Sequence, residues 1–385
     1  QIVNFKLKDI IPQLITVLAV VIIFGFFTYN AQINMESRGI DFGYGFLSQE
    51  SSFDVQFSLI EYDGSHSYFR AYLVGLLNTI LVSVIGIIIA TVLGIIVGVA
   101  RLSPNYLINK FAAFYVEFFR NIPLLLQIFF WYFAALRALP LPQDADAMFG
   151  VFFLTIKGLY VPAFVWENFN IFFYSIIATM IAIIVIRVHA RKVQEKQGKQ
   201  LPVLWISIGL ILIFPLLSFL IGGVSLSFEI PKLKQLATTS FKYEGGLSLP
   251  PELIALTLSL ALYTATFIAE CVRAGIQGVG KGQKEAAASI GLNPNQVLKL
   301  VVMPQALRII IPPTTNQYLN LTKNSSLAAA IAYPDLVLVF AGTALMQTGK
   351  AIEIVSITML TYLSLSISIS ILMNWYNKKI AIKEK

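Results

Sequence analysis

Long apolar runs separated by short polar segments make up most of this chain of 385 residues. The run 72–100 holds no charged side chain, and about 20 apolar residues are enough for a helix to cross a bilayer. Such runs predict eight membrane-spanning helices, so we expect an all-α polytopic membrane protein. The predicted spans lie near 11–29, 72–100, 111–136, 171–187, 203–223, 252–273, 304–341 and 354–377.

The amino-acid composition supports this class. Hydrophobic residues make up 57% of the chain and charged residues 12%, against about 25% charged residues in a typical soluble domain. The run near 11–29 lacks a cleavage site and is expected to be a span rather than a signal peptide. Because the numbering begins at Gln1 rather than at a methionine, we expect a few residues to precede it.

Lysines and arginines orient the predicted spans. If the N-terminus faces the cytoplasm, 18 of the 28 fall in inner segments and eight in outer segments, while Arg120 and Lys323 lie within spans. The inner set includes Lys6 near one end of the chain and Lys383 and Lys385 at the other. An inner excess of this kind predicts that both termini are cytoplasmic. It also explains the net charge of +8, so no nucleic-acid partner is expected.

The spans divide the chain into segments of different character. Residues 1–71 hold one extra span and an outer loop, and 143–250 hold two plain spans, a basic loop and polar outer loops. We interpret 143–250 as an insertion between two parts of a functional core, 72–142 and 251–385. Chemistry is expected in the core, where proline, small polar residues and intramembrane charges gather.

Catalytic, nucleotide and metal sites are not indicated. The stretch GIQGVGKG (275–282) nearly fits a phosphate-binding loop, but position 282 is glycine and no strand precedes it. The single cysteine, Cys271, permits neither an intrachain disulfide nor a cysteine-based metal site. We therefore expect no catalytic residue, no metal and no cofactor, and a protein that does not hydrolyse ATP by itself.

A charged, alanine-rich stretch, KGQKEAAASIGLNPNQVLKL (281–300), lies between two spans on the predicted cytoplasmic side. Lys284, Glu285 and the following alanines favour a helix with Glu285 in its first turn. Gly291 is expected at C′, and Asn293 is expected to cap a second helix with Pro294 at N1. A docking helix and a plain solvated loop helix both remain possible at this point.

Two E-x-x-R sequences, Glu117 to Arg120 and Glu270 to Arg273, lie near predicted cytoplasmic ends of spans. Residues three apart meet on one helix face, and pairing lowers the penalty of charge near lipid. We favour charge neutralisation that anchors the helix ends.

The interval 304–326 is unusually polar for a span. Pro312 and Pro313 remove two backbone donors and are expected to break or kink the helix. The polar residues that follow must be buried in protein or line a water-filled cavity. Either a substrate pathway or an internal scaffold between subunits meets this requirement, and the residues alone favour the scaffold. These residues are Thr314, Thr315, Asn316, Gln317, Asn320, Thr322, Lys323, Asn324, Ser325 and Ser326.

Residues 285–305, EAAASIGLNPNQVLKLVVMPQ, resemble the EAA motif of permease subunits in bacterial ATP-binding-cassette importers. Val301 and Met303 stand where isoleucine and leucine are usual. Three further stretches resemble the branch for polar amino acids: EFFRNIPLLLQ (117–127), the residues around the motif from 268 to 328, and YPDL (333–336). The motif positions at the family spacing are Glu285, Ala286, Ala287, Gly291 and Pro304.

The resemblance covers about 72–137 and 252–380, and Gly280 stands where the family commonly has proline. The extra first span and the insertion resemble the longer permease subunits of general L-amino-acid uptake systems. The resemblance to the permease family implies a type I importer core in the bacterial inner membrane, with 281–304 as the segment that couples to the ATPase. The tentative substrate pathway is Gln127, Lys323, Asn324 and Ser325.

The resemblance also implies partners. These are two cytoplasmic ATP-binding subunits, a periplasmic amino-acid-binding protein and a second, homologous permease subunit. The long insertion favours a heterodimer. The alternative is an ion-gradient-driven amino-acid transporter that acts alone, which predicts inverted repeats. The two E-x-x-R copies lie on the same predicted side and argue against inversion.

Overall fold

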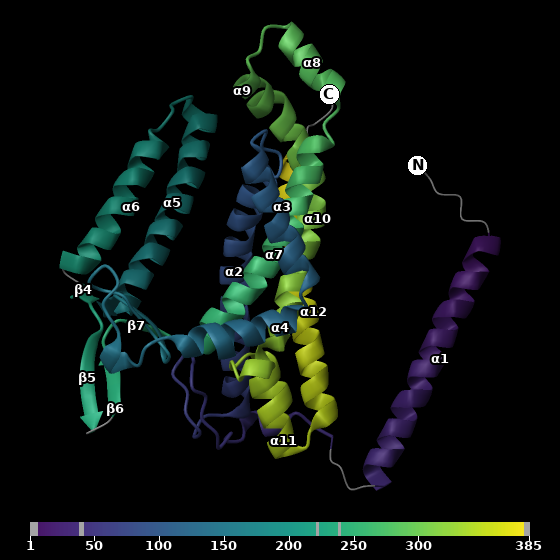
Figure 1. Ribbon diagram of the computed structural model, residues 1–385, viewed down its shortest axis with the longest axis vertical. Helices are drawn as coiled ribbons and strands as arrows, with labels where there is room; N and C mark the ends of the chain where they lie inside the picture. Colours follow the sequence, from purple (N-terminus) through teal and green to yellow (C-terminus); the bar gives the residue numbers. More distant parts are fainter. Residues whose placement is uncertain (1–6, 38–41, 221–222, 238–239, 381–385) are drawn as a thin grey trace. The chain divides into compact units, whose positions relative to one another are not determined.

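A computed structural model describes residues 7–37, 42–220, 223–237 and 240–380 (Figure 1). The predicted cytoplasmic residues Lys6, Lys383 and Lys385 lie outside this part, as do positions 221 and 222 of the predicted span 203–223. The chain forms two compact units. The first combines 1–121 with 260–385, and the second is 122–259.

The predicted membrane class is confirmed. Seven helices in the described ranges are long and apolar enough to cross a bilayer, and one broken pair brings the number to eight if it counts as one span. The helices that carry the spans are α1 (Leu7–Ser37), α2 (Tyr68–Ala100), α3 (Tyr106–Asn121) with α4 (Leu124–Phe129), α5 (Phe169–Gln197), α6 (Val203–Leu220), α7 (Pro251–Gln277), α10 (Met303–Asn324) and α12 (Ala351–Ile380).

The predicted continuous span at 111–136 is wrong. Helix α3 ends at Asn121 and α4 begins at Leu124, followed by a π-helical turn at Phe130–Ala135. Pro123 lies at the break; it has no backbone donor, and the residue before a proline disfavours helical geometry. A proline inside an apolar run therefore ended this span.

The sequence predicts that Pro312 and Pro313 break or kink the helix; the break is wrong, because α10 runs through both prolines, and the kink stays a prediction. The hydroxyls of Thr314 and Thr315 donate to the carbonyls of Ile310 and Ile311 at 2.7 and 3.0 Å. These bonds satisfy the two hydroxyls inside the helix, whereas the carbonyls that the prolines leave without a helical donor are those of Arg308 and Ile309.

The interruption instead follows Asn324. A 3-10 helix, Ser325–Ile331, leads to Ala332 in the left-handed region at φ +59°. A separate short apolar helical segment, 337–348, then replaces the end of the predicted span 304–341.

Close helix packing holds the first unit together. An added Cβ at Gly94 of α2 would lie 2.6 Å from Cβ of Ile268 on α7, and one at Gly98 would lie 2.7 Å from Cβ of Val272. Small residues allow membrane helices to approach in this way. A buried cluster around Phe46, Tyr68 and Phe340 closes one end of the unit.

The two ends of the first unit carry different elements (Figure 1). One end holds the 3-10 helix Gly45–Ser48, the start of α2 and α11 (Leu345–Thr348). The other end holds α8 (Lys281–Ser289) and α9 (Pro294–Val297). The alanine-rich stretch is therefore far along the bundle from the segment that precedes α2.

The second unit contains short strands that the all-α expectation missed. They form a three-stranded sheet in the order β1-β2-β7 and two antiparallel pairs, β3-β4, whose strands are separated in sequence by α5 and α6, and β5-β6. Every strand has three to six residues, which is too short for an alternating pattern to stand out beside long apolar spans. The strands are β1 (Phe153–Thr155), β2 (Gly158–Val161), β3 (Ala163–Glu167), β4 (Ser225–Glu229), β5 (Lys232–Ala237), β6 (Ser240–Glu244) and β7 (Leu247–Leu249).

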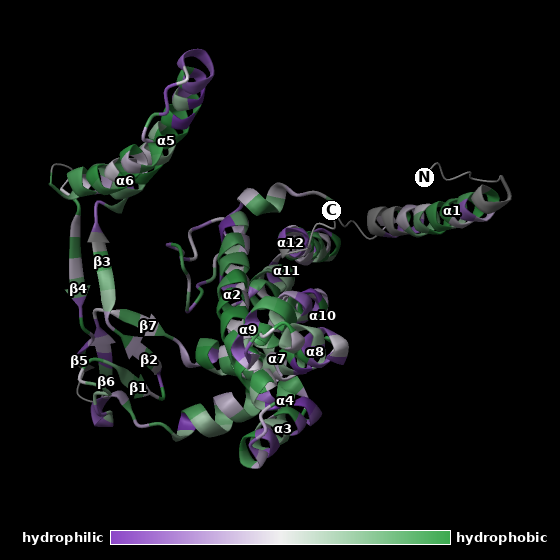
Figure 2. Ribbon diagram, turned by 90° about the horizontal axis from the view of Figure 1, so that it is seen from above, coloured by the Kyte–Doolittle hydropathy of each residue, from purple (hydrophilic) through white to green (hydrophobic). Residues whose placement is uncertain are grey.

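Helices α5 and α6 of the same unit lie side by side, and their hydrophilic residues gather at the turn that joins them (Figure 2). The boundaries 143 and 250 of the predicted insertion fall inside this unit. The insertion itself remains a prediction.

The α2–α7 contact generates a stability prediction. We expect Gly94→Ala to lower the free energy of unfolding by about 1–3 kcal/mol, because overpacking forces neighbouring side chains to shift. Thermal unfolding of the purified protein in detergent measures the effect. Gly209→Ala in α6 is the matched control, since an added Cβ there meets nothing within 4 Å. Equal unfolding temperatures for the two variants would contradict close α2–α7 packing.

Candidate functional site

The alanine-rich stretch folds as two short helices joined by a tight turn, as the sequence predicts. Helix α8 ends at Ser289, and Gly291 adopts φ +87°. The backbone N–H of Gly291 donates to the Ala288 carbonyl at 3.0 Å, and that of Leu292 donates to the Ala287 carbonyl at 3.3 Å. This pair of bonds is a Schellman motif, which needs a left-handed residue and so favours glycine.

The second helix begins with a complete capping box. Asn293 Oδ1 accepts from the backbone N–H of Gln296 at 2.9 Å, and the Gln296 side chain accepts from the N–H of Asn293 at 3.0 Å. A π-helical turn at Leu298–Val302 leads from α9 directly into α10, with Pro304 in the first turn of α10. Helix α9 is thus joined to α10 by continuous helical backbone.

The expected start of α8 needs correction. The helix begins at Lys281, so Glu285 lies in its second turn and is not a first-turn acid. Glycine at 282 does not prevent this, because its lower helix propensity amounts to only about 1 kcal/mol. Glu285 and Ala286 are exposed, whereas Ala287 is buried.

Large apolar side chains on this segment are exposed, and the sequence interpretation overlooked them. Ile290 is 78% exposed and Leu300 is 60% exposed. Ile290 follows α8 outside the candidate spans, whereas Leu300 lies in the candidate span Pro294–Ile331, where lipid or protein can cover it. Their signal in the sequence was the presence of isoleucine and leucine in a stretch otherwise rich in alanine and charge.

The two E-x-x-R sequences behave differently. Arg273 Nε donates to Glu270 Oε1 at 3.1 Å, and Arg101 Nη1 also donates to the Glu270 carboxylate. Arg273 Nη1 further donates to Gln277 Oε1 at 2.6 Å. Glu270 therefore joins the end of α2 to α7, and Arg101 is a member that sequence spacing could not reveal.

No ion pair joins Glu117 and Arg120 in the ranges that the structure describes. Glu117 Oε2 accepts from Asn121 Nδ2 at 3.4 Å. The Arg120 guanidinium carbon lies 5.0 Å from the ring centroid of Phe267 on α7, which is cation–π range.

Helix α10 presents a polar stripe at membrane depth. Asn316, Asn320 and Lys323 are exposed and recur at the three- and four-residue spacing of one helix face. Thr322 and Ser325 are buried, and their hydroxyls donate to the carbonyls of Tyr318 and Thr322. The polar run therefore divides into an exposed face and a self-satisfied interior face.

The four tentative pathway residues differ in exposure, and their role stays a prediction. Lys323 is exposed and belongs to the stripe, Asn324 is half-buried, and Ser325 is buried. Gln127 belongs to the second unit, where it is buried and its Nε2 donates to the Ile122 carbonyl at 2.9 Å. A residue that contacts a transported substrate must be exposed, and Lys323 is the exposed residue among these four.

A buried acidic group in the loop after the 3-10 helix was missed. Asp335 is fully buried, and its Oδ1 accepts from the N–H of Leu338 at 2.9 Å. Asn78 Nδ2 donates to the Pro334 carbonyl at 2.9 Å, and Thr79 Oγ1 accepts from the N–H of Leu336 at 3.0 Å. These contacts fix the loop against α2.

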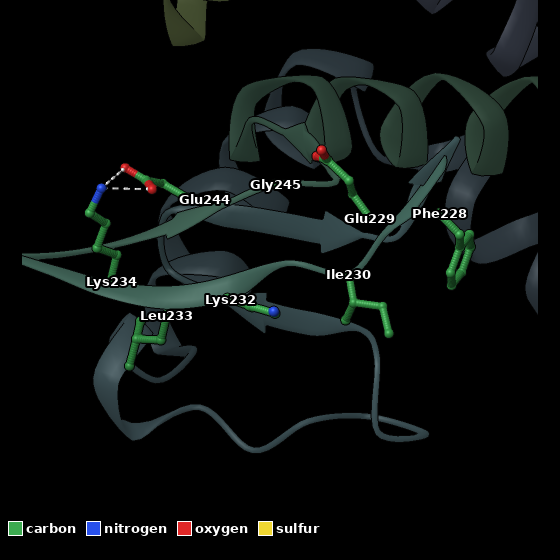
Figure 3. Close-up of a pocket in the computed structure, with 8 residues that line it drawn as sticks. All are labelled: Phe228, Glu229, Ile230, Lys232, Leu233, Lys234, Glu244 and Gly245. Atoms are coloured by element: carbon green, nitrogen blue, oxygen red, sulfur yellow. Dashed lines mark hydrogen bonds and ion pairs between the residues drawn. The ribbon is translucent and has the colours of Figure 1, made fainter. Parts of the chain in front are cut away.

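A surface pocket of about 640 Å³ lies on the short strands of the second unit (Figure 3). Lys234 Nζ and Glu244 Oε2 form an ion pair at its edge, 2.9 Å apart. Phe228 and Leu233 also line it and are largely exposed. None of the residues predicted for function lies in this pocket. Within the described ranges, no three His, Cys, Asp or Glu side chains gather as metal ligands.

Several proteins similar to this chain are named as amino-acid transport permeases. YhdX of Escherichia coli (strain K12), named as an amino-acid ABC transporter permease protein, is 48% identical over 376 residues, covering 97% of this chain and 94% of the relative. The general L-amino acid transport system permease protein AapQ of Rhizobium johnstonii is 45% identical over 381 residues, covering 99% and 94%.

A third relative is BztB of Rhodobacter capsulatus, named as a glutamate/glutamine/aspartate/asparagine transport system permease protein. It is 40% identical over 388 residues, covering 92% of this chain and 89% of the relative. The profile of the family described as binding-protein-dependent transport system inner membrane component matches residues 198–382. This chain therefore belongs to the family of binding-protein-dependent transport system inner membrane components, the permeases of ATP-binding-cassette transporters.

Proposed function

We propose that this chain is the permease subunit of an importer that moves amino acids into the cytoplasm, driven by ATP hydrolysis on separate subunits. The names of the relatives support amino acids as the substrate class. One observation carries the mechanism: the exposed segment of α8 and α9 continues without a loop into α10, which bears the polar stripe.

The coupling step uses the surface of α8 and the turn after it. The exposed carboxylate of Glu285 offers a charge-assisted contact, and the exposed side chain of Ile290 offers apolar area for a cleft on the ATPase. The Schellman turn at Gly291 sets the angle between α8 and α9. Displacement of this segment by the ATPase then moves the start of α10, because π-helical and α-helical backbone bonds connect them.

The transport step uses the stripe of Asn316, Asn320 and Lys323. Polar side chains at membrane depth need water or protein against them, and the stripe lies on the outside of a single first unit. A second permease subunit that faces this stripe across a water-filled path meets both needs. We propose a heterodimer, since the insertion 143–250 gives this chain a surface that a shorter homologue would lack.

Charge suits the stripe to amino acids. The ammonium group of Lys323 can donate charge-assisted hydrogen bonds to the α-carboxylate of the substrate. The side-chain amide of Asn320 can both donate and accept hydrogen bonds. A soluble binding protein delivers the substrate on the side opposite α8 and α9, and both termini of the chain lie in the cytoplasm. In this arrangement Glu270, Arg273 and Arg101 keep the ends of α2 and α7 together near the coupling segment.

Reversal of charge at Glu285 tests the coupling role. We expect Glu285→Lys to lower ATP-driven amino-acid uptake in proteoliposomes about tenfold or more, because a like charge placed in an interface costs several kcal/mol. Thermal unfolding of the permease should be unchanged, since Glu285 is exposed. Gln283→Lys places a new lysine elsewhere on α8 and should have a smaller effect. Wild-type uptake in Glu285→Lys would contradict a role of Glu285 in coupling. Uptake without any ATPase subunit would instead favour a gradient-driven transporter.

Removal of the charge at Lys323 tests the pathway. We expect Lys323→Ala to raise the KM for uptake by about tenfold, as loss of a charged hydrogen bond corresponds to roughly 1.5–3 kcal/mol. Lys323→Arg keeps the charge and should recover much of this loss. The pathway assignment fails if Lys323→Ala leaves both uptake and substrate-stimulated ATP hydrolysis at wild-type values.

A further inference from the structure

Helix α1 needs a partner or lipid on every side. Its span, Ile11–Asn30, is strongly apolar, and none of its most apolar window is buried against the rest of the described chain. The hydroxyls of Thr16 and Thr28 donate to the carbonyls of Pro12 and Phe24 in the same helix at 2.8 and 2.7 Å. The Asn30 side chain likewise donates to the Phe26 carbonyl at 2.7 Å, so these three polar side chains are satisfied within α1.

A groove of about 420 Å³ runs between α2 and α12 in the first unit. Leu76 and Ile80 of α2 line one wall, and Ile357 and Leu365 of α12 line the other. Tyr72 and Thr361 meet across it, with their hydroxyl oxygens 3.0 Å apart. The groove thus lies between the membrane-spanning parts of two helices that meet through Tyr72 and Thr361, and it is mostly apolar.

Two small residues open this groove for close approach. Ser364 and Ser368 are both exposed on α12 and line the groove four residues apart. Their hydroxyls donate to the carbonyls of Leu360 and Ser364 at 2.7 and 2.8 Å, so neither needs a polar partner. Small residues at this spacing let another helix approach within van der Waals contact.

The chain that follows α1 is fixed at the mouth of the groove. The N–H of Gly43 donates to Oε1 of the buried Glu353, 2.9 Å away, in the first turn of α12. Phe46 then packs in one cluster with Tyr68, at the start of α2, and with Ile354. That cluster is continuous with Tyr72, Leu76 and Ile357, which line the groove.

Chain length keeps α1 close to this point. Six residue steps separate Ser37, the last residue of α1, from Gly43, and such a connection spans at most about 20 Å. A short tether gives an effective concentration on the order of millimolar, which a separate subunit does not have. Because α1 ends where α2 and α12 begin, it would run antiparallel to both.

We propose that α1 packs into the groove between α2 and α12 of its own chain. The apolar span, the small-residue wall of the groove and the tether at Gly43 all lead to the same occupant. In this arrangement α1 belongs to the core of this permease as a third helix beside α2 and α12, rather than to its partner subunit. The proposal does not depend on which substrate the complex carries.

Disulfide cross-linking tests this placement. The native Cys271 is first replaced by serine, and cysteine pairs are then made in the full complex in membranes. Ser364 lies about 20 Å along α12 from Ala351 at 1.5 Å per residue, the same depth that residue 17 has along α1 from Asn30. Single cysteines at Thr16, Val17, Leu18 and Ala19 cover one turn, so one or two of them must face the groove.

Each α1 cysteine is paired with Ser364→Cys and, as a depth-matched control, with Leu363→Cys, an exposed position that does not line the groove. We expect oxidation to form an intrachain disulfide with Ser364→Cys at one or two α1 positions and at least about fivefold less with Leu363→Cys. Uptake before oxidation should match the Cys271→Ser background, which shows that the variants are folded.

Two results would overturn the proposal. A disulfide between an α1 cysteine and a cysteine introduced into the second permease subunit, seen on a non-reducing gel as the combined mass of the two subunits, would place α1 against the neighbouring subunit. Equal or absent cross-linking with Ser364→Cys and Leu363→Cys, together with normal uptake, would mean that lipid fills the groove.

Discussion

The structure depends on one constraint, which is that polar groups at membrane depth must be satisfied by protein or water because lipid offers no hydrogen bonds. Hydroxyls on α10 and α12 meet it by donating to carbonyls three or four residues earlier, as Thr314 and Ser364 do. The loop at 332–336 meets it through Asn78 and Thr79 of α2. The stripe of Asn316, Asn320 and Lys323 on α10 is exposed, and the proposed second subunit and water-filled path would supply the polar surroundings that it needs.

A tight turn joins the docking helix α8 to α9, and helical backbone then runs without interruption from α9 to the transport surface on α10. The Schellman turn at Gly291 and the capping box at Asn293 define the coupling helices by local sequence alone. The π-helical turn at Leu298–Val302 then joins them to α10. Because a flexible loop would absorb displacement, helical continuity is the feature that lets docking at one end alter the stripe at the other.

Several features could be predicted from the sequence because they rest on local chemistry. The spans follow from apolar length, and the turn at Gly291 follows from the φ that only glycine adopts easily. The break at Pro123 and the uninterrupted helix through Pro312 show the limit. Both sites contain proline, yet the helix ends at one and continues through the other, so the residue type alone does not decide the outcome.

Long-range partners were the second limit. Glu270 pairs with Arg273, three positions away, and also with Arg101, which lies 169 positions away in the sequence. Glu117 and Arg120 are likewise three positions apart, but no ion pair joins them in the part of the chain that the structure describes. The exposed side chain of Ile290 and the short strands of the second unit were missed for a related reason: exposure and strand pairing depend on what the rest of the chain covers.

Nucleotide-dependent accessibility of the α10 stripe tests the central claim most directly. A cysteine at Asn316, in a Cys271→Ser background, is labelled by a membrane-impermeant thiol reagent added to the outside of vesicles that contain the whole complex. The labelling rate should change at least severalfold between the ATP-bound and nucleotide-free states, and Glu285→Lys should abolish that change. A labelling rate that is the same in both nucleotide states would contradict the account.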